Sequence, residues 1–295
     1  MFGKHKNKKI DFIGIGAAKC GTSWVFQCLQ EHPQINMPSN KSLFFFNSDK
    51  GNEYVKDNWS HWDRGINWYL SQFPSSEKGK IRGEFGVSYL HDPKAARRIH
   101  KNFSDTKILV ILRNPADMLH SLYWFNHNTV EARIPSTFEK AVVYKWCLDR
   151  GNYYKHLKSY YHLFSPKNIH VMLLDDVVHS PELVVRDLYE FLEVDADFVP
   201  AELSQRVLPA TGHKSKLLKN IGAHAFNFME IFKLDSLRNF VRDTPIFYSI
   251  YEKLNVVERD YPPMTKKIRE NLIGRYSRDI RKLEGLLDKD LSFWK

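Results

Sequence analysis

The segment Gly16-Ala17-Ala18-Lys19-Cys20-Gly21-Thr22-Ser23 contains the residue types that bind a phosphate group. It lies between a strand-like and a helix-like stretch, so that backbone N–H groups of the loop and of the first helical turn point toward one anion. Lys19 can reach a bridging oxygen of a leaving phosphate, and the hydroxyl groups of Thr22 and Ser23 can donate to its terminal oxygens. The glycine spacing is that of a nucleoside triphosphatase loop, but the Gly-Lys-Ser/Thr ending is absent because the lysine stands inside the loop. The alternative interpretation is a plain turn that contains a lysine.

Two further segments carry groups that can bind anions. Arg113 follows a strand-like run, and Ser121 lies on the helix that is expected after it. The carboxyl ends of strands are where open α/β sheets bind their ligands. A basic loop places Lys214, Ser215 and Lys216 where they could close over an anion. Three such elements favour a ligand with two separated phosphates over a triphosphate, whereas a surface ion pair of Arg113 and a solvated lysine run are the alternatives.

Strand-like and helix-like segments alternate along the chain, which is typical of an α/β fold. We therefore predict a central parallel sheet flanked by helices, a phosphate-binding loop after the first strand, and a helical C-terminal part. The expected domain is a single one over residues 1–295, with a basic tail at 1–9 and a helical insertion or lid at 217–264. Strands are expected at 10–16, 81–85, 107–113 and 169–174, with a short aromatic edge at 41–46. Helices are expected at 22–31, 61–73, 93–102, 153–164 and 181–192, and a further helix begins at 115. The chain is expected to be helical throughout 217–294 apart from a break at 261–263.

Composition narrows the partners and the cellular setting. The 295 residues carry a formal net charge of +10, which favours an anionic partner. The longest aliphatic run, Ile108–Leu112, is far shorter than the ~20 residues of a membrane span, and Met1–Lys9 lacks the apolar stretch of a secretory signal. Cys20, Cys28 and Cys147 form no CxxC pair, and the thirteen histidines are scattered. We therefore expect a cytoplasmic protein without disulfides, a metal site or a transmembrane segment.

These motifs resemble those of the sulfotransferases that use 3'-phosphoadenosine-5'-phosphosulfate (PAPS), and the heparan sulfate and bacterial branch more than the cytosolic phenol and steroid branch. Residues 18–24 resemble the family's 5'-phosphosulfate loop, and residues 112–121 its 3'-phosphate motif. The blocks 65–69, 73–74, 82–84, 88–89 and 290–294 are also similar, so that the resemblance extends from Asp11 to Trp294.

The resemblance implies a set of donor-binding residues and a product, 3'-phosphoadenosine 5'-phosphate (PAP). The loop implied to hold the 5'-phosphosulfate comprises Ala18, Lys19, Cys20, Gly21, Thr22, Ser23 and Trp24. Arg113 and Ser121 are implied to hold the 3'-phosphate.

The chain departs from the family at the position of its catalytic base. Glycosaminoglycan members place a glutamate just before a His-Phe-Phe stretch, and here Ser42 and Phe44 stand at the glutamate and histidine positions. A serine is no ordinary general base at neutral pH. Glu84 and His91 are the candidate bases, and the remaining possibilities are that the acceptor needs little help or that the enzyme is impaired. We expect Ser42, Phe44 and Tyr89 to line the acceptor site.

Three functions compete on this sequence. The first is in-line transfer of a sulfuryl group from PAPS to a hydroxyl or amine of a carbohydrate or small metabolite, with Lys19 stabilising the leaving phosphate and no metal required. The second is a phosphate-loop kinase in which Asp175 or Asp176 holds magnesium. The third is a non-catalytic module that binds polyanions, although no nucleic-acid motif is visible and no nucleic-acid partner is expected. The sequence does not indicate an oligomeric state.

Overall fold

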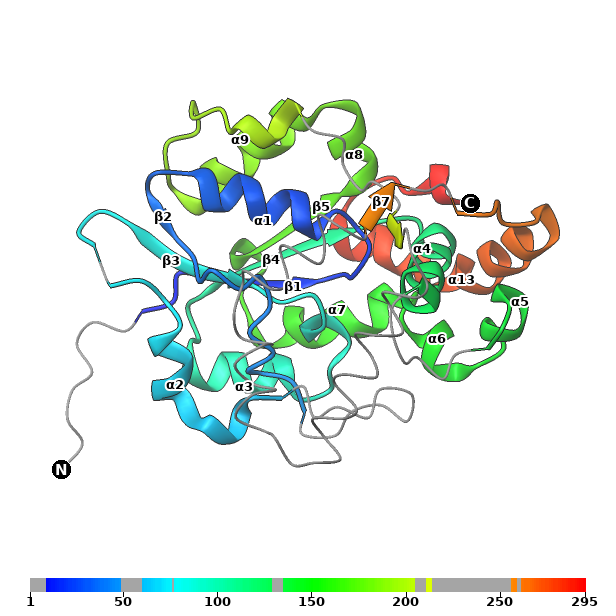
Figure 1. The fold of residues 1–295 in the computed structure, drawn as a ribbon, viewed down its shortest axis with the longest axis horizontal. Coiled ribbons are helices and arrows are strands. Elements are labelled where there is room, and N and C mark those ends of the chain that lie inside the picture. Colours follow the sequence, from blue (N-terminus) through cyan, green and yellow to red (C-terminus); the bar gives the residue numbers. More distant parts are fainter. Residues whose placement is uncertain are drawn as a thin grey trace.

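A five-stranded parallel sheet forms the centre of the computed structural model, which describes residues 9–48, 60–75, 77–128, 135–204, 211–213, 256–258 and 261–295. The strand order is β2-β3-β1-β4-β5 (Figure 1). The bounds are β1 Phe12–Gly16, β2 Ile35–Asn36, β3 Ile81–Phe85, β4 Lys107–Leu112 and β5 Ile169–Leu173. The predicted α/β class with a central parallel sheet is therefore confirmed.

The middle strand β1 owes its position to apolar side chains that are buried on both faces of the sheet. All five of its residues are buried, as is typical of parallel sheets covered by helices. Two glycines let aromatic rings pack directly on the strands. A Cβ at Gly14 would lie 2.3 Å from the ring of Phe85, and one at Gly83 would lie 2.4 Å from the ring of Phe12. This close packing fixes the strand from which the loop at 17–21 emerges.

Helices cover both faces of the sheet (Figure 1). α1, α8 and α9 lie on one face, α3 and α7 lie on the other, and α4 and α13 stand beside the carboxyl ends of the strands. The helices are α1 Thr22–Glu31, α2 Gly65–Ser71, α3 Ala95–Asn102, α4 Pro115–Asn128, α5 Phe138–Ala141, α6 Lys145–Asp149, α7 Tyr153–Leu163, α8 Leu174–His179, α9 Pro181–Leu192 and α13 Lys266–Leu287. Short 3₁₀ turns are η1 Trp62–Arg64, η2 Tyr89–His91, η3 Pro166–Asn168, η4 Ala201–Ser204 and η5 Ser292–Trp294.

The expected aromatic edge strand at 41–46 is wrong. The edge of the sheet is β2, and the 41–46 segment runs beyond it without strand pairing. Phe44 has a φ of 50°, which lies in the left-handed region, and no strand continues through such a residue. The N–H group of Phe45 donates instead to the hydroxyl of Tyr89 at 3.1 Å. The run of phenylalanines therefore reflects burial in an aromatic cluster and not β pairing.

The interpretation of the C-terminal part as entirely helical is also wrong at one point. β7 (Val256–Glu258) pairs in antiparallel fashion with β6 (Thr211–His213), and β6 contacts α4. The helical C-terminal part itself is confirmed by the 22 residues of α13. Residues 1–8 and most of 217–264 lie outside the described residues, so the tail and the insertion or lid stay predictions.

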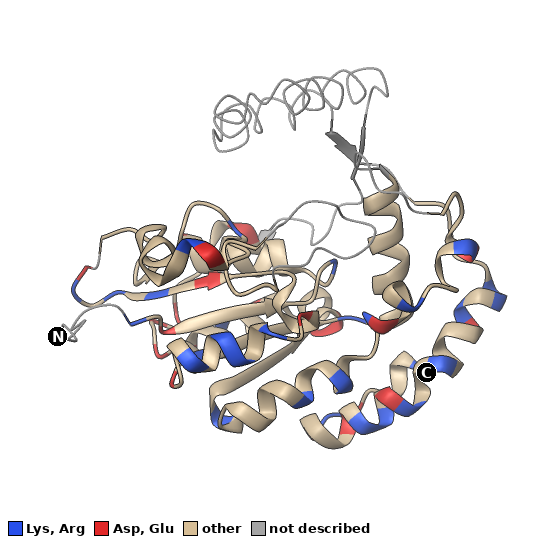
Figure 2. Ribbon diagram, turned by 90° about the horizontal axis from the view of Figure 1, so that it is seen from below, with Lys and Arg blue, Asp and Glu red and all other residues tan. Residues whose placement is uncertain are grey.

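Lys and Arg positions are spread along α13 and along other helices of the ribbon (Figure 2). The guanidinium of Arg269 on α13 forms a bidentate ion pair with Asp117 on α4. This pair ties α13 to the helix that follows β4. Within the part of the chain that the structure describes, no helix combines the length and the apolar character needed to cross a membrane.

Candidate functional site

The loop between β1 and α1 has the backbone shape of an anion cradle. The N–H group of Ala17 donates to the carbonyl of Ile111 at 2.9 Å, which ties the loop to β4. Lys19 and Gly21 have φ values of 64° and 96°, and the left-handed conformation of Lys19 costs about 1 kcal/mol. Gly21 caps α1, and neither a side-chain cap nor an acidic residue occupies the first turn of this helix. The positive end of the helix dipole is thus open to an anion.

Three cations converge on this loop. The Nζ atom of Lys19 lies 4.4 Å from the ring centroid of Phe125 on α4. The Nζ atom of Lys41 donates to Thr22 Oγ1 at 2.9 Å and to Ser23 Oγ at 2.8 Å. Arg113, which follows β4, is close enough for its positive charge to lower the pKa of Lys19.

Among the described residues, no carboxylate pairs with these cations. Burial, together with the nearby Arg113, lowers the pKa of Lys19 to about 8. Burial, together with Lys19, lowers the pKa of Lys41 to about 7. Across the residues placed by the structure, none of the three cations forms an ion pair. Half-buried like charges without a carboxylate are unfavourable unless an anion joins them, so the cluster fits a phosphate or phosphosulfate.

The second predicted anion site lies at the start of α4. The side-chain oxygen of Asn114 accepts the N–H of Ala116 at 3.0 Å, and its amide donates to the carbonyl of Trp294 at 3.0 Å. These two hydrogen bonds fix Asn114, and with it the backbone next to Arg113 at the end of β4. Ser121 is only 9% exposed and lies on the same helix, one turn before Phe125. The structure thus brings Arg113 to the loop of Lys19 and places Ser121 on the helix that covers this loop.

Cys20 and Trp24 anchor the loop and the start of α1 to the core. Their side chains are buried, and burial raises the pKa of Cys20 to about 12. The Cys20 thiol donates to the carbonyl of Ala18 at 3.6 Å and lies 3.8 Å from the hydroxyl of Tyr153. The side chains of Cys20 and Trp24 therefore pack into the core, and the N–H group of Cys20 donates to the carbonyl of Ala17 at 3.3 Å.

The candidate base Glu84 is fully buried. The Tyr89 hydroxyl donates to its two carboxylate oxygens at 3.2 and 3.3 Å. Burial raises the pKa of Glu84 to about 7, against the opposing effect of the nearby tyrosine hydroxyls and the N–H of Leu43. Glu84 and Tyr89 are each 0% exposed, so they offer no surface to an acceptor. Tyr89 instead holds the 41–46 segment, because its hydroxyl accepts the N–H of Phe45. We expected Tyr89 to contact the acceptor, but its hydroxyl is bonded to Glu84 and Phe45, which favours a structural role.

The other expected acceptor residues belong to the segment that Glu84 supports. The Ser42 hydroxyl lies 3.5 Å from the carbonyl of Phe85, and the half-buried Phe44 occupies the left-handed turn. His91, the second candidate base, is used elsewhere. Its Nε2 atom lies 2.8 Å from the carbonyl of Arg150, and its ring packs edge-on against His156 at 4.7 Å. Burial lowers the pKa of His91 well below its ordinary value, so the geometry favours a structural role.

Lys214, Ser215 and Lys216 lie outside the described residues. β6 ends at His213, directly before them, and contacts α4. Sequence reasoning missed Lys41, which the structure places on the loop hydroxyls. The sequence carries no signal for this contact, because it depends on how the fold anchors the 41–46 segment.

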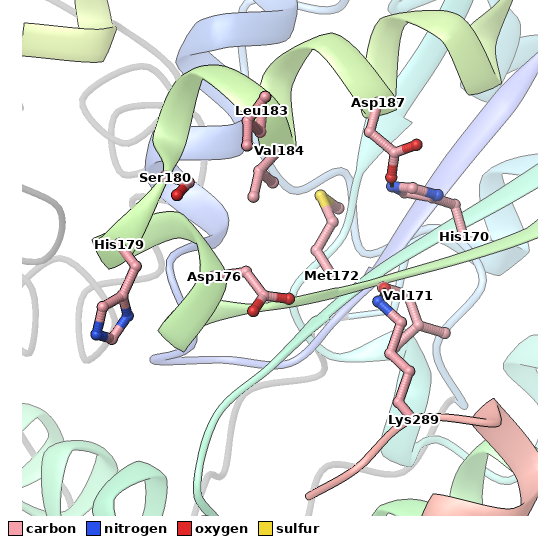
Figure 3. A pocket seen from close by; sticks show the side chains of 10 residues that line it. All are labelled: His170, Val171, Met172, Asp176, His179, Ser180, Leu183, Val184, Asp187 and Lys289. Carbon is pink, nitrogen blue, oxygen red and sulfur yellow. Dashed lines mark hydrogen bonds and ion pairs between the residues drawn. The ribbon is translucent and has the colours of Figure 1, made fainter.

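A cavity of about 380 Å³ lies at the free edge of β5, apart from these residues (Figure 3). His170 on β5 faces Asp187 on α9 there, with Nε2 and Oδ2 3.7 Å apart. Asp176, one of the two aspartates of the kinase alternative, lines this cavity, and Asp175 accepts a hydrogen bond from the indole of Trp294 at 3.0 Å. No cluster of three or more His, Cys, Asp or Glu residues suited to a metal occurs among the residues that the structure covers.

Comparison with known proteins assigns the family. A model of the sulfotransferase domain family matches residues 9–229. The membrane-associated sulfotransferase kil1 of Dictyostelium discoideum is 25% identical over 326 residues, which cover 96% of this chain and 66% of that protein. The bifunctional heparan sulfate N-deacetylase/N-sulfotransferase 1 of Caenorhabditis elegans is 28% identical over 70% of this chain, which spans only 24% of that relative.

A solved structure supports the same architecture. The sulfotransferase from Alicyclobacillus acidocaldarius aligns with a TM-score of 0.69 at 24% identity, over 97% of this chain and 98% of its own. This likeness shows the shared α/β fold. The family match covers most of the chain, and its residues include the loop of Lys19 and the strand end at Arg113. The chain belongs to the sulfotransferase family.

Proposed function

We propose that this sulfotransferase transfers the sulfuryl group of PAPS to a hydroxyl or amine of a carbohydrate. The observation that carries the donor side is the cluster of Lys19, Lys41 and Arg113 at the carboxyl ends of the strands, which has no carboxylate partner within the described chain. Support for a carbohydrate acceptor comes from the relatives, among them human heparan sulfate glucosamine 3-O-sulfotransferase 6. That protein is 31% identical over 109 residues, which cover 37% of this chain and 28% of the human protein.

The reaction needs positioning and charge stabilisation. The acceptor oxygen or nitrogen forms a bond to sulfur, and the bond between sulfur and the 5'-phosphate oxygen breaks, so that negative charge grows on that oxygen. Lys19 neutralises this charge, while the N–H groups at the start of α1 and the hydroxyls of Thr22 and Ser23 hold the phosphate. We assign the 3'-phosphate to Arg113 and Ser121.

Acceptor binding is proposed on the aromatic surface that adjoins the 41–46 segment. Phe45 and Tyr69 are core residues, but Trp62 and Trp68 are half-buried. The ring of Trp62 lies 5.2 Å from that of Phe45, and the guanidinium of Arg64 lies 5.0 Å from the ring of Trp68. Half-exposed indoles beside a cation can stack on a sugar ring and attract its anionic substituents.

The proton of the acceptor is not assigned to Ser42, because an ordinary hydroxyl does not accept a proton at neutral pH. We propose that Glu84 is a positioning residue, since its carboxyl is enclosed and bonded to Tyr89. Because the transition state of such transfers is loose, the acceptor proton leaves late and passes to solvent water, so that no strong base is needed. The cytoplasmic localisation stays a prediction, and the free, buried thiols of the three cysteines are compatible with it.

PAP should raise the thermal unfolding midpoint of the protein in the presence of EDTA. A ligand that binds only the folded state stabilises it in proportion to its occupancy, and the cation cluster supplies the positive charge without a divalent ion. Differential scanning fluorimetry with PAP and with ATP plus magnesium provides the measurement. Stabilisation by ATP plus magnesium together with none by PAP would reject the donor assignment and favour the kinase alternative.

Arg113→Ala should weaken PAP binding about 10- to 100-fold, because a charge-assisted hydrogen bond to a phosphate is worth about 1.5–3 kcal/mol. Adenosine 5'-phosphosulfate lacks the 3'-phosphate, so its affinity should change far less. Isothermal titration calorimetry with both nucleotides measures the difference. The matched control is Arg186→Ala, since Arg186 is an exposed residue of α9 that pairs with Glu190. Equal losses for both nucleotides would make Arg113 a structural residue.

A further inference from the structure

Lys41 makes two contacts that no sequence motif announces. Its Nζ atom donates to the hydroxyl oxygens of Thr22 and Ser23, from a segment 18 and 19 positions further along the chain. A hydroxyl that accepts one hydrogen bond keeps its own proton for another acceptor. Lys41 therefore turns both hydroxyls into oriented donors at the N-terminus of α1, the end of the helix that attracts anions.

The position of Lys41 is set by the fold. The next residue, Ser42, contacts the carbonyl of Phe85, and Leu43 is buried. Two residues further on, the N–H of Phe45 is held by the Tyr89 hydroxyl. The base of the lysine side chain is thus anchored to β3 and η2, and its ammonium is carried to the loop that follows β1.

The described surroundings of Lys41 are positively charged. The charged group that faces Lys41 is Lys19 from the loop, and Arg113 lies beyond Lys19 at the end of β4. No carboxylate placed by the structure contributes to the titration of Lys41. Two neighbouring ammonium groups that are partly removed from water repel each other, and an anion between them relieves this repulsion.

We propose that Lys41 is a second lysine of the 5'-phosphosulfate site, which orients the hydroxyls of Thr22 and Ser23 in the free enzyme and contacts the bound 5' group itself. This inference rests on the proposed function, because it assumes that the loop binds the donor nucleotide. It adds a donor-binding residue that lies at the start of the segment leading to the acceptor side.

An anion bound beside Lys41 and Lys19 changes the protonation of both lysines. With pKa values of about 7 and 8, Lys41 and Lys19 are partly neutral at pH 8 in the free enzyme. A bound phosphate favours the charged form of both, so that binding draws protons from the buffer. An arginine at position 41 would stay charged throughout and would take up none.

The experiment is calorimetry of PAP binding at pH 8 in two buffers that differ in ionisation enthalpy, which gives the number of protons taken up. The unchanged protein should take up more than one proton per PAP, and Lys41→Met should take up about one fewer. The same variant should bind PAP and adenosine 5'-phosphate about tenfold more weakly or worse, and adenosine 3'-phosphate as before. Lys80→Met is the control, since Lys80 pairs with Glu77 ahead of β3 and should change none of these values.

The outcomes separate the two proposals. If the unchanged protein binds no PAP, the proposed function fails. If it binds PAP and Lys41→Met matches it in proton uptake and in affinity for the 5'-phosphorylated nucleotides, the inference on Lys41 is overturned while the function stands. Should Lys41→Met not fold, Lys41→Arg decides the matter. PAP affinity close to that of the unchanged protein, with about one proton fewer, supports the inference, and unchanged proton uptake refutes it.

Discussion

Replacing Lys19 with alanine should lower kcat by about 10²–10³, the loss that follows removal of one preorganised electrostatic donor. The reason is that charge grows on the leaving phosphate oxygen only as the sulfuryl group departs, so that the ammonium acts more strongly on the transition state than on the bound donor. The free energy of unfolding should change little, since the ammonium contacts the ring of Phe125 and forms no ion pair with the residues that the structure places. Turnover at saturating PAPS and urea unfolding measure the two quantities.

The ring that faces Lys19 offers a control for this prediction. Phe125→Leu keeps the ammonium and removes only a cation–π contact worth about 0.5–1 kcal/mol at a site that is 39% exposed. Its kcat should therefore fall less than tenfold. If Lys19→Ala instead keeps the kcat of the unchanged enzyme and raises only the KM for PAPS, Lys19 binds donor and transition state equally and is not catalytic.

Glu84→Gln should remove a pH dependence of stability. The pKa of Glu84 is raised from 4.5 to about 7 by burial, so that between these values the folded state holds a proton that the unfolded state has lost. The free energy of unfolding must therefore fall as the pH rises through this range. At about 1.4 kcal/mol per pKa unit, we expect the difference between the unchanged protein and Glu84→Gln to fall by about 2–3 kcal/mol from pH 5 to pH 8.

Urea unfolding of both proteins at several pH values measures this difference. Glu193→Gln is the matched control, because Glu193 is an exposed carboxyl whose pKa is lowered by its hydrogen bond to Lys107. Glu193 stays ionised throughout pH 5 to 8 in both states, so its removal should add no slope. A difference for Glu84→Gln that is as flat as that of Glu193→Gln would mean that Glu84 is ionised in the folded protein and is stabilised by its tyrosine neighbours.

The strand, loop and helix around Lys19 could be predicted from the sequence because the information for them is local. β1, the loop and α1 form one continuous stretch, and a buried apolar strand followed by glycines and hydroxyl residues has few alternatives. The predicted bounds of α1 and β3 are those of the structure. α4 begins at Pro115 as expected, since proline suits the first turn of a helix.

The supporting side of the site could not be predicted, because it depends on contacts between distant residues. Three consecutive phenylalanines indicate an edge strand as readily as an aromatic cluster, and only the tertiary contact with Tyr89 decides between them. His91 is a plausible base in isolation, but a carbonyl 59 positions away at Arg150 binds its ring. The approach of Lys41 to the loop follows from the same anchoring and is equally invisible in the sequence.

The hydrogen bond between Asn114 and the carbonyl of Trp294 spans 180 positions of the chain. During synthesis the N-terminal part of a protein emerges first and begins to fold as a unit. The sheet and the loop of Lys19 can therefore form while the residues around Trp294 are still being made. The end of β4 gains this partner only later, and contacts of such long range form slowly because a large loop must close. A nascent chain should consequently form the loop of Lys19 before the end of β4 beside Arg113 is fixed.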